Sequence, residues 1–455
     1  MTIDAGTLYH HSAAEVHETL RRYMLADGLP IVLDPVASRG AWLVDKRTGK
    51  RYLDLFSFFA SQPLGFNHPR LRDESFREKI DAVASVKVTN SDVYTQAMAD
   101  FVQTFGDIAI PESHRHHLFF VEGGALAVEN AMKAAFDWKY RKNEQKGLAA
   151  TEDLQILHFK SAFHGRSGYT LSVTNTADPR KYQYFPKFDW PRVSTPGCTG
   201  CLACDGSKCQ RTGSENDAVV AAEQRSLAEI EAAIASRGHH IAAILIETIQ
   251  GEGGDNHFRP EFLRALREIC DREDMLLIFD EVQTGMGLTG TWWAFQQLGV
   301  EPDVFSFGKK SQVCGIAANR RLDEVDSVFK VSSRINSTWG GNLVDMVRAE
   351  RVVQVIQEEG LLANVEEMGQ RLLAGFRKIA ADTGKISRVR GRGLMLAFDF
   401  ADGATRDRFN KALFEREVMM LACGATTMRT RPVLDIDAEA VDVAIERIRD
   451  AVESL

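Results

Sequence analysis

The chain has 455 residues and a mass of 50.7 kDa, with 44% hydrophobic residues, a formal charge of −8 at pH 7 and a pI near 5.9. This length exceeds what one hydrophobic core usually serves, so we expect two or more domains. The acidic balance excludes the basic footprint of a nucleic-acid-binding protein and the polybasic face that binds anionic membrane. No apolar stretch approaches the roughly 18 residues of a membrane span, and residues 1–25 lack the apolar core of a secretory signal. These features favour a cytoplasmic protein that acts on small molecules.

The first 75 residues predict a helix followed by short strands. An amphipathic pattern over about residues 12–25 indicates the helix. The stretch GAWLVDKRTGKRYLDLFS (40–57) predicts two strands that turn at Thr48-Gly49. We assign residues 1–75 to an N-terminal segment that packs against the small domain.

Residues 76–340 alternate short apolar runs with helical patterns. The strand-like runs are HLFFVEGG (117–124), LQILHFK (154–160), IAAILIET (241–248), MLLIFDE (275–281) and DVFSFG (303–308). Residues 215–238 and 259–274 read as amphipathic helices, the second opening with Pro260 near its first turn. This alternation predicts an α/β large domain with a mostly parallel sheet.

Residues 341–455 differ from the preceding part. Helical patterns cover residues 344–360 and 363–384, a strand pattern lies near LMLAFDF (394–400), and a helix ends the chain. We expect a smaller α+β C-terminal domain.

The seven cysteines fall into two groups. Cys270, Cys314 and Cys423 are scattered, as expected of structural thiols in a reducing compartment. The other four lie in PGCTGCLACDGSKCQ with C-x2-C-x2-C-x4-C spacing, which is compatible with a structural tetrahedral zinc site or with an iron–sulfur cluster. Free or redox-paired thiols are the alternative. These four are Cys198, Cys201, Cys204 and Cys209.

An acid and a lysine 29 residues apart end two of the apolar runs, namely Asp280 and Lys309. Buried parallel strands open onto a ligand crevice at their carboxyl ends, where these two side chains would meet. A buried carboxylate needs a cationic partner and a buried lysine tends to lose its proton. The pair suggests pyridoxal 5'-phosphate, which has a basic ring nitrogen and an aldehyde. The alternatives are an Asp-Glu ligand pair for Mg²⁺ and an ordinary surface lysine.

A third feature is the stretch VEGGALAVENAMKAAFDWK, where a strand ends at Val121 and Gly123-Gly124 leads into a helix. Backbone amides at a helix start, with the positive end of its dipole, form a phosphate site. Gly123, Gly124 and Ala125 allow a phosphate to approach the backbone closely. An ordinary strand-to-helix turn is the alternative.

These motifs resemble the class III, fold type I pyridoxal-phosphate-dependent aminotransferases, and among them most the lysine 6-aminotransferase subfamily. The resemblance covers nearly the whole chain and implies a mostly parallel seven-stranded sheet flanked by helices in the large domain. It rests on residues 40–57, LGFNHP (64–69), EGGALAVENAMKAA (122–135), SAFHGRSGYTLS (161–172), ETIQGEGG (247–254), FDEVQTGMGLTG (279–290), FGKKSQVCG (307–315), NSTWGGN (336–342) and RTRPVL (429–434).

The resemblance implies a role for each matching residue. Lys309 would bind the cofactor aldehyde and shuttle a proton, with Lys310 as the fallback; Asp280 would keep the ring nitrogen protonated. The other positions implied are Gln283 at the ring hydroxyl, Phe163 stacked on the ring with His164 beside it, Gly124 and Ala125 at the phosphate, and Thr338 at the phosphate of the neighbouring subunit. The active site would then require a homodimer.

Two arginines and a glutamate are implied for the substrates. Arg431 would hold the carboxylate beside the keto group of 2-oxoglutarate, and Arg166 the distant carboxylate, which is the α-carboxylate of L-lysine. Glu252 would neutralise Arg431 while lysine is bound and swing away for 2-oxoglutarate. The implied products are 2-aminoadipate 6-semialdehyde and L-glutamate, formed in a ping-pong exchange.

Three departures from the family pattern stand out: Thr248 replaces a usual proline, the cysteine-bearing loop is an addition, and Met286 and Leu288 stand where many members carry other residues after the Thr-Gly pair. The alternatives are another ω-aminotransferase with ornithine, 4-aminobutyrate or a diamine as donor, and, in a different class, a non-catalytic protein that binds pyridoxal phosphate or a metal. Isomerisation or decarboxylation on the same scaffold is a third.

Overall fold

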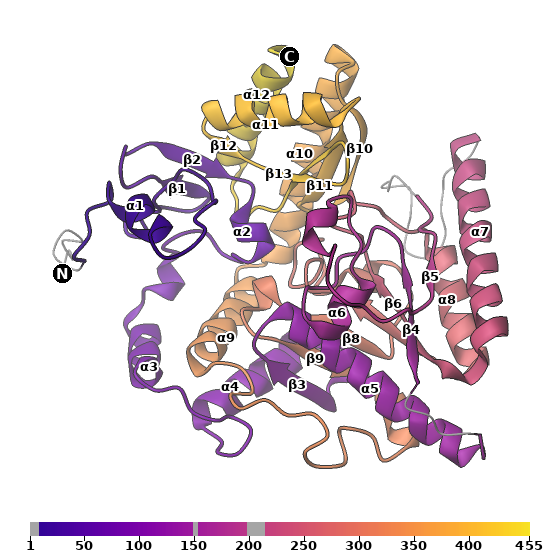
Figure 1. The fold of residues 1–455 in the computed structure, drawn as a ribbon. Helices are drawn as coiled ribbons and strands as arrows, with labels where there is room; N and C mark the ends of the chain where they lie inside the picture. The colour runs from indigo at the N-terminus through magenta and orange to yellow at the C-terminus, as the bar shows by residue number, and fades with distance from the viewer. Residues whose placement is uncertain (1–8, 149–152, 198–213) are drawn as a thin grey trace.

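The computed structural model describes residues 9–148, 153–197 and 214–455. Within these ranges the strands form three sheets, of seven, four and three strands. Figure 1 shows the large sheet in the lower body of the molecule, the four-stranded sheet above it, and the N-terminal strands to one side. No helix in the described ranges is both long enough and apolar enough to cross a membrane.

The predicted mostly parallel seven-stranded sheet is confirmed. β9 runs antiparallel to both of its neighbours, and the remaining strands run parallel to one another. In spatial order the strands are β3 (His117–Val121), β9 (Cys314–Ala318), β8 (Val304–Phe307), β7 (Leu276–Asp280), β6 (Ile241–Glu247), β4 (Gln155–Phe159) and β5 (Arg192–Val193).

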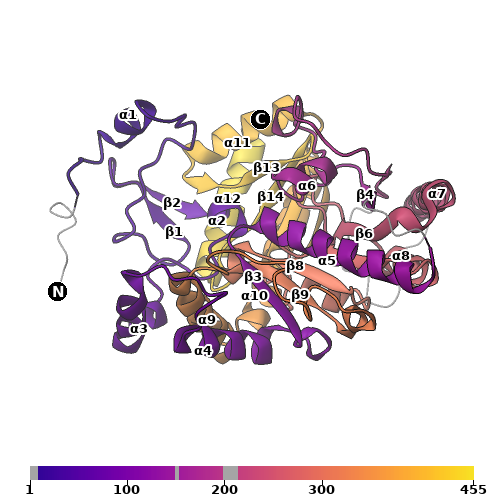
Figure 2. The same ribbon diagram turned by 60° about the horizontal axis from the view of Figure 1, so that its bottom comes forward.

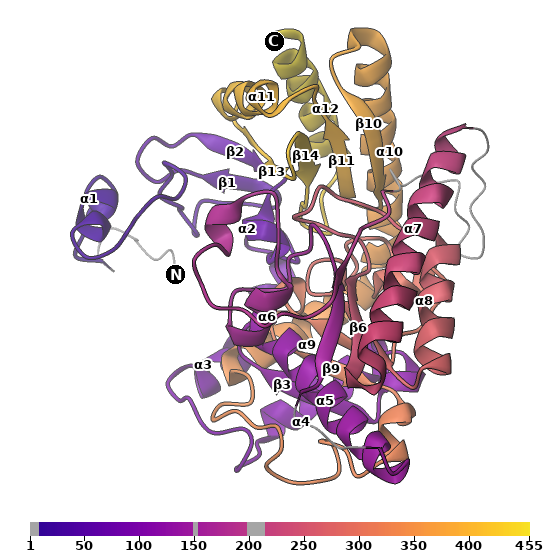
Figure 3. The same cartoon turned by 45° about the vertical axis from the view of Figure 1, so that its right-hand side comes forward.

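The inner strands are mostly apolar up to their carboxyl ends because helices cover both faces of the sheet. Successive residues of a strand point to opposite faces, so Ile278 packs in one hydrophobic cluster and Phe279 in the other. α5 crosses the first face, as Figure 2 shows, and α7 and α8 stand side by side over the second, as in Figure 3. The bounds are α5 (Gly124–Gln145), α6 (Gly168–Val173), α7 (Ser214–Arg237) and α8 (Pro260–Arg272).

The C-terminal part contains the four-stranded antiparallel sheet with helices packed against it. Its predicted helices and the strand near 394–400 are confirmed. The elements are α9 (Leu343–Glu358), α10 (Leu361–Thr383), β10 (Ser387–Arg392), β11 (Met395–Asp399), α11 (Gly403–Glu415), β13 (Leu421–Cys423), β14 (Thr427–Thr430) and α12 (Ala438–Glu453).

The N-terminal segment joins the C-terminal part through a shared sheet. β1 (Trp42–Val44) and β2 (Arg51–Asp54) form the predicted hairpin, and β12 (Val418–Met419) pairs in parallel with β2. α1 spans only Val16–Arg21, shorter than expected, because no residue of the helix is buried. The remaining helices are α2 (Ser57–Ala60), α3 (Glu74–Ala84) and α4 (Gln96–Thr104). The domain boundaries at residues 75 and 340 stay a prediction.

Candidate active site

A cavity of about 330 Å³ lies at the carboxyl ends of β6, β7 and β8. Among its lining residues are most of the side chains that the sequence predicted, namely Gly124, Ala125, Phe163, His164, Arg166, Glu252, Asp280, Gln283 and Lys309. A larger, more apolar cavity of about 730 Å³ lies between the N-terminal strands and α11 and contains none of them. The smaller cavity is therefore the candidate site.

Asp280 and Lys309 converge because their strands are neighbours. Asp280 ends β7 opposite Ser306 of β8, and Lys309 follows two residues after the end of β8. The Asp280 carboxylate accepts hydrogen bonds from the Val282 amide at 3.0 Å and the Ser306 hydroxyl at 3.2 Å. Burial lowers the pKa of Lys309 to about 8, with Asp280 opposing the shift. About one fifth of this amine is therefore neutral near physiological pH, far more than of an ordinary lysine.

Lys310 points elsewhere, although burial lowers its pKa to about 7. Its ammonium donates to the carbonyl oxygens of Gln62 at 2.7 Å and Pro432 at 2.9 Å. These contacts tie the N-terminal segment to the C-terminal part. The pKa alone would favour Lys310 as the nucleophile, but only Lys309 of the two lines the cavity.

Glu281 does not form a metal pair with Asp280. Its carboxylate accepts from the Thr248 and Thr284 hydroxyls and from the backbone amides of Ala294 and Phe295. Thr248 thus uses its hydroxyl where the family usually has proline.

Within the described residues, no cluster of three or more metal-ligating side chains occurs. Cys198, Cys201, Cys204 and Cys209 lie outside the described residues, so the predicted metal site stays a prediction.

The part of the cavity that was predicted to hold a phosphate has the expected backbone. β3 ends at Val121, Gly123 has a φ of +102°, and α5 begins at Gly124. A Cβ atom at Gly124 would lie 2.9 Å from Val282 Cγ1, so only glycine fits there. No described side chain caps the start of this 22-residue helix, so its first amides and its dipole favour an anion there.

His164 and Glu247 surround the buried carboxylate of Asp280. His164 Nδ1 lies 2.8 Å from Asp280 Oδ2, while its Nε2 is buried without a hydrogen-bond partner in the described part of the chain. Glu247 ends β6 and accepts from the amides of Phe163 and Gly251. Burial raises the pKa of Glu247 to about 7, with His164 opposing and Asp280 adding to the shift. These contacts fix the loop that presents Phe163 to the cavity.

Arg166 is exposed at the cavity, with its guanidinium carbon 5.7 Å from the centre of the Phe163 ring. No described carboxylate forms an ion pair with it. Its five N–H donors are thus available to an incoming anion.

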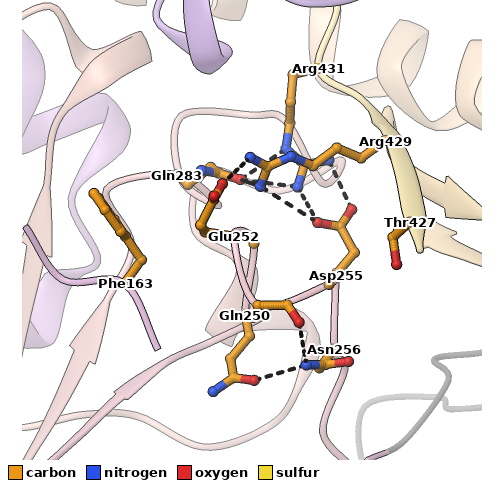
Figure 4. A network of polar contacts seen from close by, with 12 residues as sticks. Phe163, Gln250, Glu252, Asp255, Asn256, Gln283, Thr427, Arg429 and Arg431 are labelled. Carbon is orange, nitrogen blue, oxygen red and sulfur yellow. Dashed lines mark hydrogen bonds and ion pairs between the residues drawn. The ribbon is translucent and has the colours of Figure 1, made fainter. Parts of the chain in front are cut away.

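The expected pairing of Glu252 with Arg431 is wrong, because Glu252 binds Arg429. The Arg429 Nη2 to Glu252 Oε2 distance is 2.7 Å, and the Arg429 Nε is buried without a partner in the described residues. Arg429 is not among the residues that line the cavity, and Figure 4 shows its guanidinium in contact with Glu252, which is. Moving Glu252 would expose spare donors of this arginine.

Arg431 has no such capacity. Its Nη1 and Nη2 donate to Asp255 at 3.0 and 2.5 Å, its Nη1 also donates to the Thr430 carbonyl, and its Nε and Nη2 donate to Gln283 Oε1 (Figure 4). Both Arg431 and Asp255 are fully buried. Gln283 also accepts from Arg429 at 3.1 Å, so its carbonyl is committed to arginines and its amide NH₂ remains for the cavity.

Thr338 lies apart from the cavity and is exposed. Its segment is held against residues 90–91, because Asn90 donates to the Gly341 carbonyl at 2.8 Å and Ser91 to the Ser337 carbonyl at 3.1 Å. Trp339 beside it is 41% exposed. Two other large apolar side chains, Val93 and Tyr94, are more exposed still. This surface is suited to a protein contact.

The sequence reasoning missed Glu247 and Arg429. Glu247 had the same signal as Asp280, a charged residue at the end of an apolar run. The only signal for Arg429 was its position two residues before Arg431. That position does not show which of the two arginines contacts Glu252.

The family model described as Aminotransferase class-III matches residues 23–452. The L-lysine-epsilon aminotransferase of Mycobacterium tuberculosis is 53% identical over 443 residues, covering 96% of this chain and 95% of that protein. The L-lysine-epsilon aminotransferase of Streptomyces clavuligerus is 46% identical, with coverage of 99% and 96%. The solved structure of lysine aminotransferase from M. tuberculosis in the internal aldimine form has a TM-score of 0.93 at 51% identity and covers 98% of this chain and 100% of that one. The chain therefore belongs to the class III aminotransferases of fold type I, enzymes that use pyridoxal phosphate.

Proposed function

We propose that this protein transfers the ε-amino group of L-lysine to 2-oxoglutarate with pyridoxal 5'-phosphate, giving 2-aminoadipate 6-semialdehyde and L-glutamate. The observation that carries the proposal is the unequal state of two arginines at one cavity. Arg166 is open to an anion, whereas Arg429 is covered by Glu252.

The residues present fit the cofactor. The Asp280 carboxylate accepts from Val282 and Ser306 and keeps acceptor capacity for a protonated ring nitrogen. Lys309 offers an amine whose lowered pKa suits bond formation with an aldehyde. Gly124 and Ala125 present backbone amides to a phosphate. When bound, pyridoxal phosphate supplies an aldehyde that takes up the amino group and a ring that withdraws electrons.

The protein side chains then hold, orient and move protons. Lys309 Nζ would take up and return the proton of the carbon that bears the amino group. The Asp280 side chain would hold the ring N–H, and its contacts with His164, the Val282 amide and the Ser306 hydroxyl fix its orientation. Phe163 covers one wall of the cavity and keeps water from the reacting atoms.

The two arginines explain how one cavity accepts two different substrates. Lysine presents one carboxylate, which Arg166 holds while the side-chain amine reaches Lys309. Glu252 meanwhile neutralises Arg429, which would otherwise face an uncharged chain. 2-Oxoglutarate has two carboxylates, so Arg166 takes one and Arg429 the other after Glu252 moves aside. Arg429 thus takes the role that the sequence reasoning gave to Arg431.

The names of the relatives support lysine as the donor, because those at 53% and 46% identity over nearly the whole chain are L-lysine-epsilon aminotransferases. The test is the absorbance of the bound cofactor after lysine is added without an acceptor, with the aldehyde product identified. Lysine should convert the cofactor faster than ornithine, 4-aminobutyrate or a diamine. A strong preference for 4-aminobutyrate would overturn the assignment, and conversion by none of these amines would favour a binding protein.

The Glu252 gate has its own test. Glu252→Ala should impair the lysine half-reaction more than the glutamate half-reaction, because only the first needs Arg429 neutralised. Equal losses would count against the gate.

The proposal includes a homodimer in which Thr338 reaches the neighbouring subunit's phosphate. Its exposure outside its own cavity and the apolar side chains beside it support this arrangement. Mixing Lys309→Ala with Thr338→Ala subunits should yield hybrid dimers that regain an intact site.

A further inference from the structure

We propose that Lys181 is a positioning residue that holds Glu252 when this carboxylate leaves Arg429, and so favours the acceptor half-reaction. The inference rests on the proposed function, since it concerns how the cavity changes between its two substrates. It concerns a residue outside the motifs that define the family resemblance.

Glu252 is held by two cations at once. Its Oε2 lies 2.7 Å from Arg429 Nη2, and its Oε1 forms a short ion pair with Lys181 Nζ. The side chains of Lys181 and Glu252 are 23% and 18% exposed, so the pair is partly shielded from water and salt. Each oxygen of the carboxylate therefore has its own cation.

The local fold directs Lys181 to this contact. Lys181 ends the short 3₁₀ turn Pro179–Lys181 (η4), which Asp178 caps by accepting from the Arg180 amide. Arg180 pairs with Asp178 and its side chain is 82% exposed. Two adjacent cations thus point different ways, Arg180 to solvent and Lys181 to Glu252. In the described ranges, Glu252 is the ion-pair partner of Lys181.

Counting charges shows when Lys181 matters most. In the closed arrangement of this structure, Arg429, Lys181 and Glu252 form a group with two positive charges and one negative charge, beside the ion pair of Arg431 with Asp255. A 2-oxoglutarate carboxylate on Arg429 adds a second negative charge, and the group becomes two neutral pairs. Without Lys181, the displaced Glu252 would remain a partly buried carboxylate with no cation, which is costly.

The same contact stabilises the open arrangement more than the closed one. In the closed arrangement Glu252 keeps Arg429 even if Lys181 is removed. In the open arrangement Lys181 is its remaining cation. An ion pair contributes more to a carboxylate that has no other partner, so Lys181 shifts the balance towards opening.

The experiment compares Lys181→Met with Arg180→Met, which removes a neighbouring positive charge from the same turn without touching Glu252. Each half-reaction is followed from the spectrum of the bound cofactor, with the amino form prepared by adding pyridoxamine phosphate to cofactor-free enzyme. In Lys181→Met, kcat/KM for 2-oxoglutarate should fall about tenfold while that for lysine is unchanged. Arg180→Met should match the wild type in both, and Lys181→Arg should restore the acceptor half-reaction.

A binding measurement provides a readout independent of turnover. Glutarate has both carboxylates of 2-oxoglutarate but no keto group, and calorimetry should show that it binds about tenfold more weakly to Lys181→Met. Unchanged or improved use of 2-oxoglutarate would overturn the proposal, because it would mean that Lys181 holds the gate closed or plays no part.

A double variant separates a positioning role from direct contact with the acceptor. In a Glu252→Gln background the carboxylate is gone, so adding Lys181→Met should change little. A further large loss would show that Lys181 binds the acceptor itself and would refute the positioning role. The acceptor half-reaction, glutarate binding and the double variant do not require lysine to be the donor, so a wild-type enzyme that does not use lysine would refute the proposed function alone.

Discussion

The Arg431 guanidinium and the Asp255 carboxylate form a bidentate ion pair, with nitrogen–oxygen distances of 3.0 and 2.5 Å, in which both residues are fully buried. Asp255 adopts a φ of +48° in the loop after β6, which places its carboxylate under the end of β14. This ion pair uses the N–H donors of Arg431. Of the two arginines in RTRPVL, Arg429 is therefore the one with spare donors.

Replacing the two arginines should therefore give different defects. Arg431→Met removes both hydrogen bonds of Arg431 to the buried Asp255 carboxylate, leaves only Arg429 Nη1 at 4.0 Å as its cation among the described residues, and should lower the free energy of unfolding by about 3 kcal/mol. Arg429→Met should keep most of the stability, because Glu252 retains Lys181, but reduce kcat/KM for 2-oxoglutarate at least about 100-fold. Denaturant unfolding and the acceptor half-reaction measure the two effects. A stable Arg431→Met enzyme that fails only with 2-oxoglutarate would return the substrate role to Arg431.

Replacing Lys309 and replacing Lys310 should likewise give two different defects, one in activity and one in stability. Borohydride reduction of the cofactor-loaded enzyme, followed by peptide mass analysis, should find the cofactor on Lys309. Lys309→Ala should lose this label and the activity while keeping its stability. Lys310→Ala should keep the label but unfold more easily, because the carbonyls of Gln62 and Pro432 lose their buried donor. A label on Lys310 would contradict this expectation, because it would show that the lower pKa of Lys310 decides the attachment and the position of Lys309 in the cavity does not.

The sequence was sufficient where a single strand determines the position of a side chain. The apolar run MLLIFDE predicted that Asp280 ends a buried strand, and the Gly123-Gly124 turn predicted where α5 begins. Both follow from local pattern, because strand burial and helix starts depend on neighbours in the chain. Because β7 and β8 are parallel neighbours, their carboxyl ends lie side by side, and this places Lys309 near Asp280.

The sequence was insufficient where the position depends on remote partners. Arg429 and Arg431 are two residues apart, and side chains at this spacing along a strand point to the same face. The sequence pattern therefore cannot distinguish the two arginines. Asp255 decides between them from a loop remote in the sequence, and Gly251 beside it allows the approach, since a Cβ there would lie 2.2 Å from Gln283 Oε1. Lys181 lies in an irregular segment that has no periodicity to reveal its contact with Glu252.

The lowered pKa of Lys309 predicts how the cofactor-free enzyme takes up pyridoxal phosphate. Only the neutral amine attacks an aldehyde, and burial lowers its pKa to about 8, compared with about 10.4 for a free lysine. The rate of covalent uptake should rise with pH and reach half its maximum near pH 8. Stopped-flow absorbance across pH 6.5 to 10 measures it, with Lys309→Ala as the control. A rate still rising at pH 10 would contradict a desolvated amine.

Asp54 provides a stability prediction with a defined sign. Its Oδ1 accepts from the amides of Phe56 and Ser57 at 2.8 and 2.7 Å, whereas its buried Oδ2 has no partner in the described residues. Burial raises the pKa of Asp54 to about 6, with these hydrogen bonds and Lys310 opposing. Between about pH 4 and 6 the folded state binds more protons than the unfolded state, so the wild type loses stability as pH rises through this window.

Asp54→Asn keeps the oxygen that accepts both amides and cannot ionise. The variant should match the wild type near pH 4 and exceed it by on the order of 2 kcal/mol at pH 8, where Lys310, with a pKa of about 7, is mostly uncharged. Calorimetric melting of both proteins from pH 4.5 to 8 would show the difference growing and then levelling above pH 6. A difference that is independent of pH would mean that Asp54 keeps its ordinary pKa. A variant less stable than the wild type at pH 8 would mean that the Asp54 charge stabilises Lys310 by more than its burial costs.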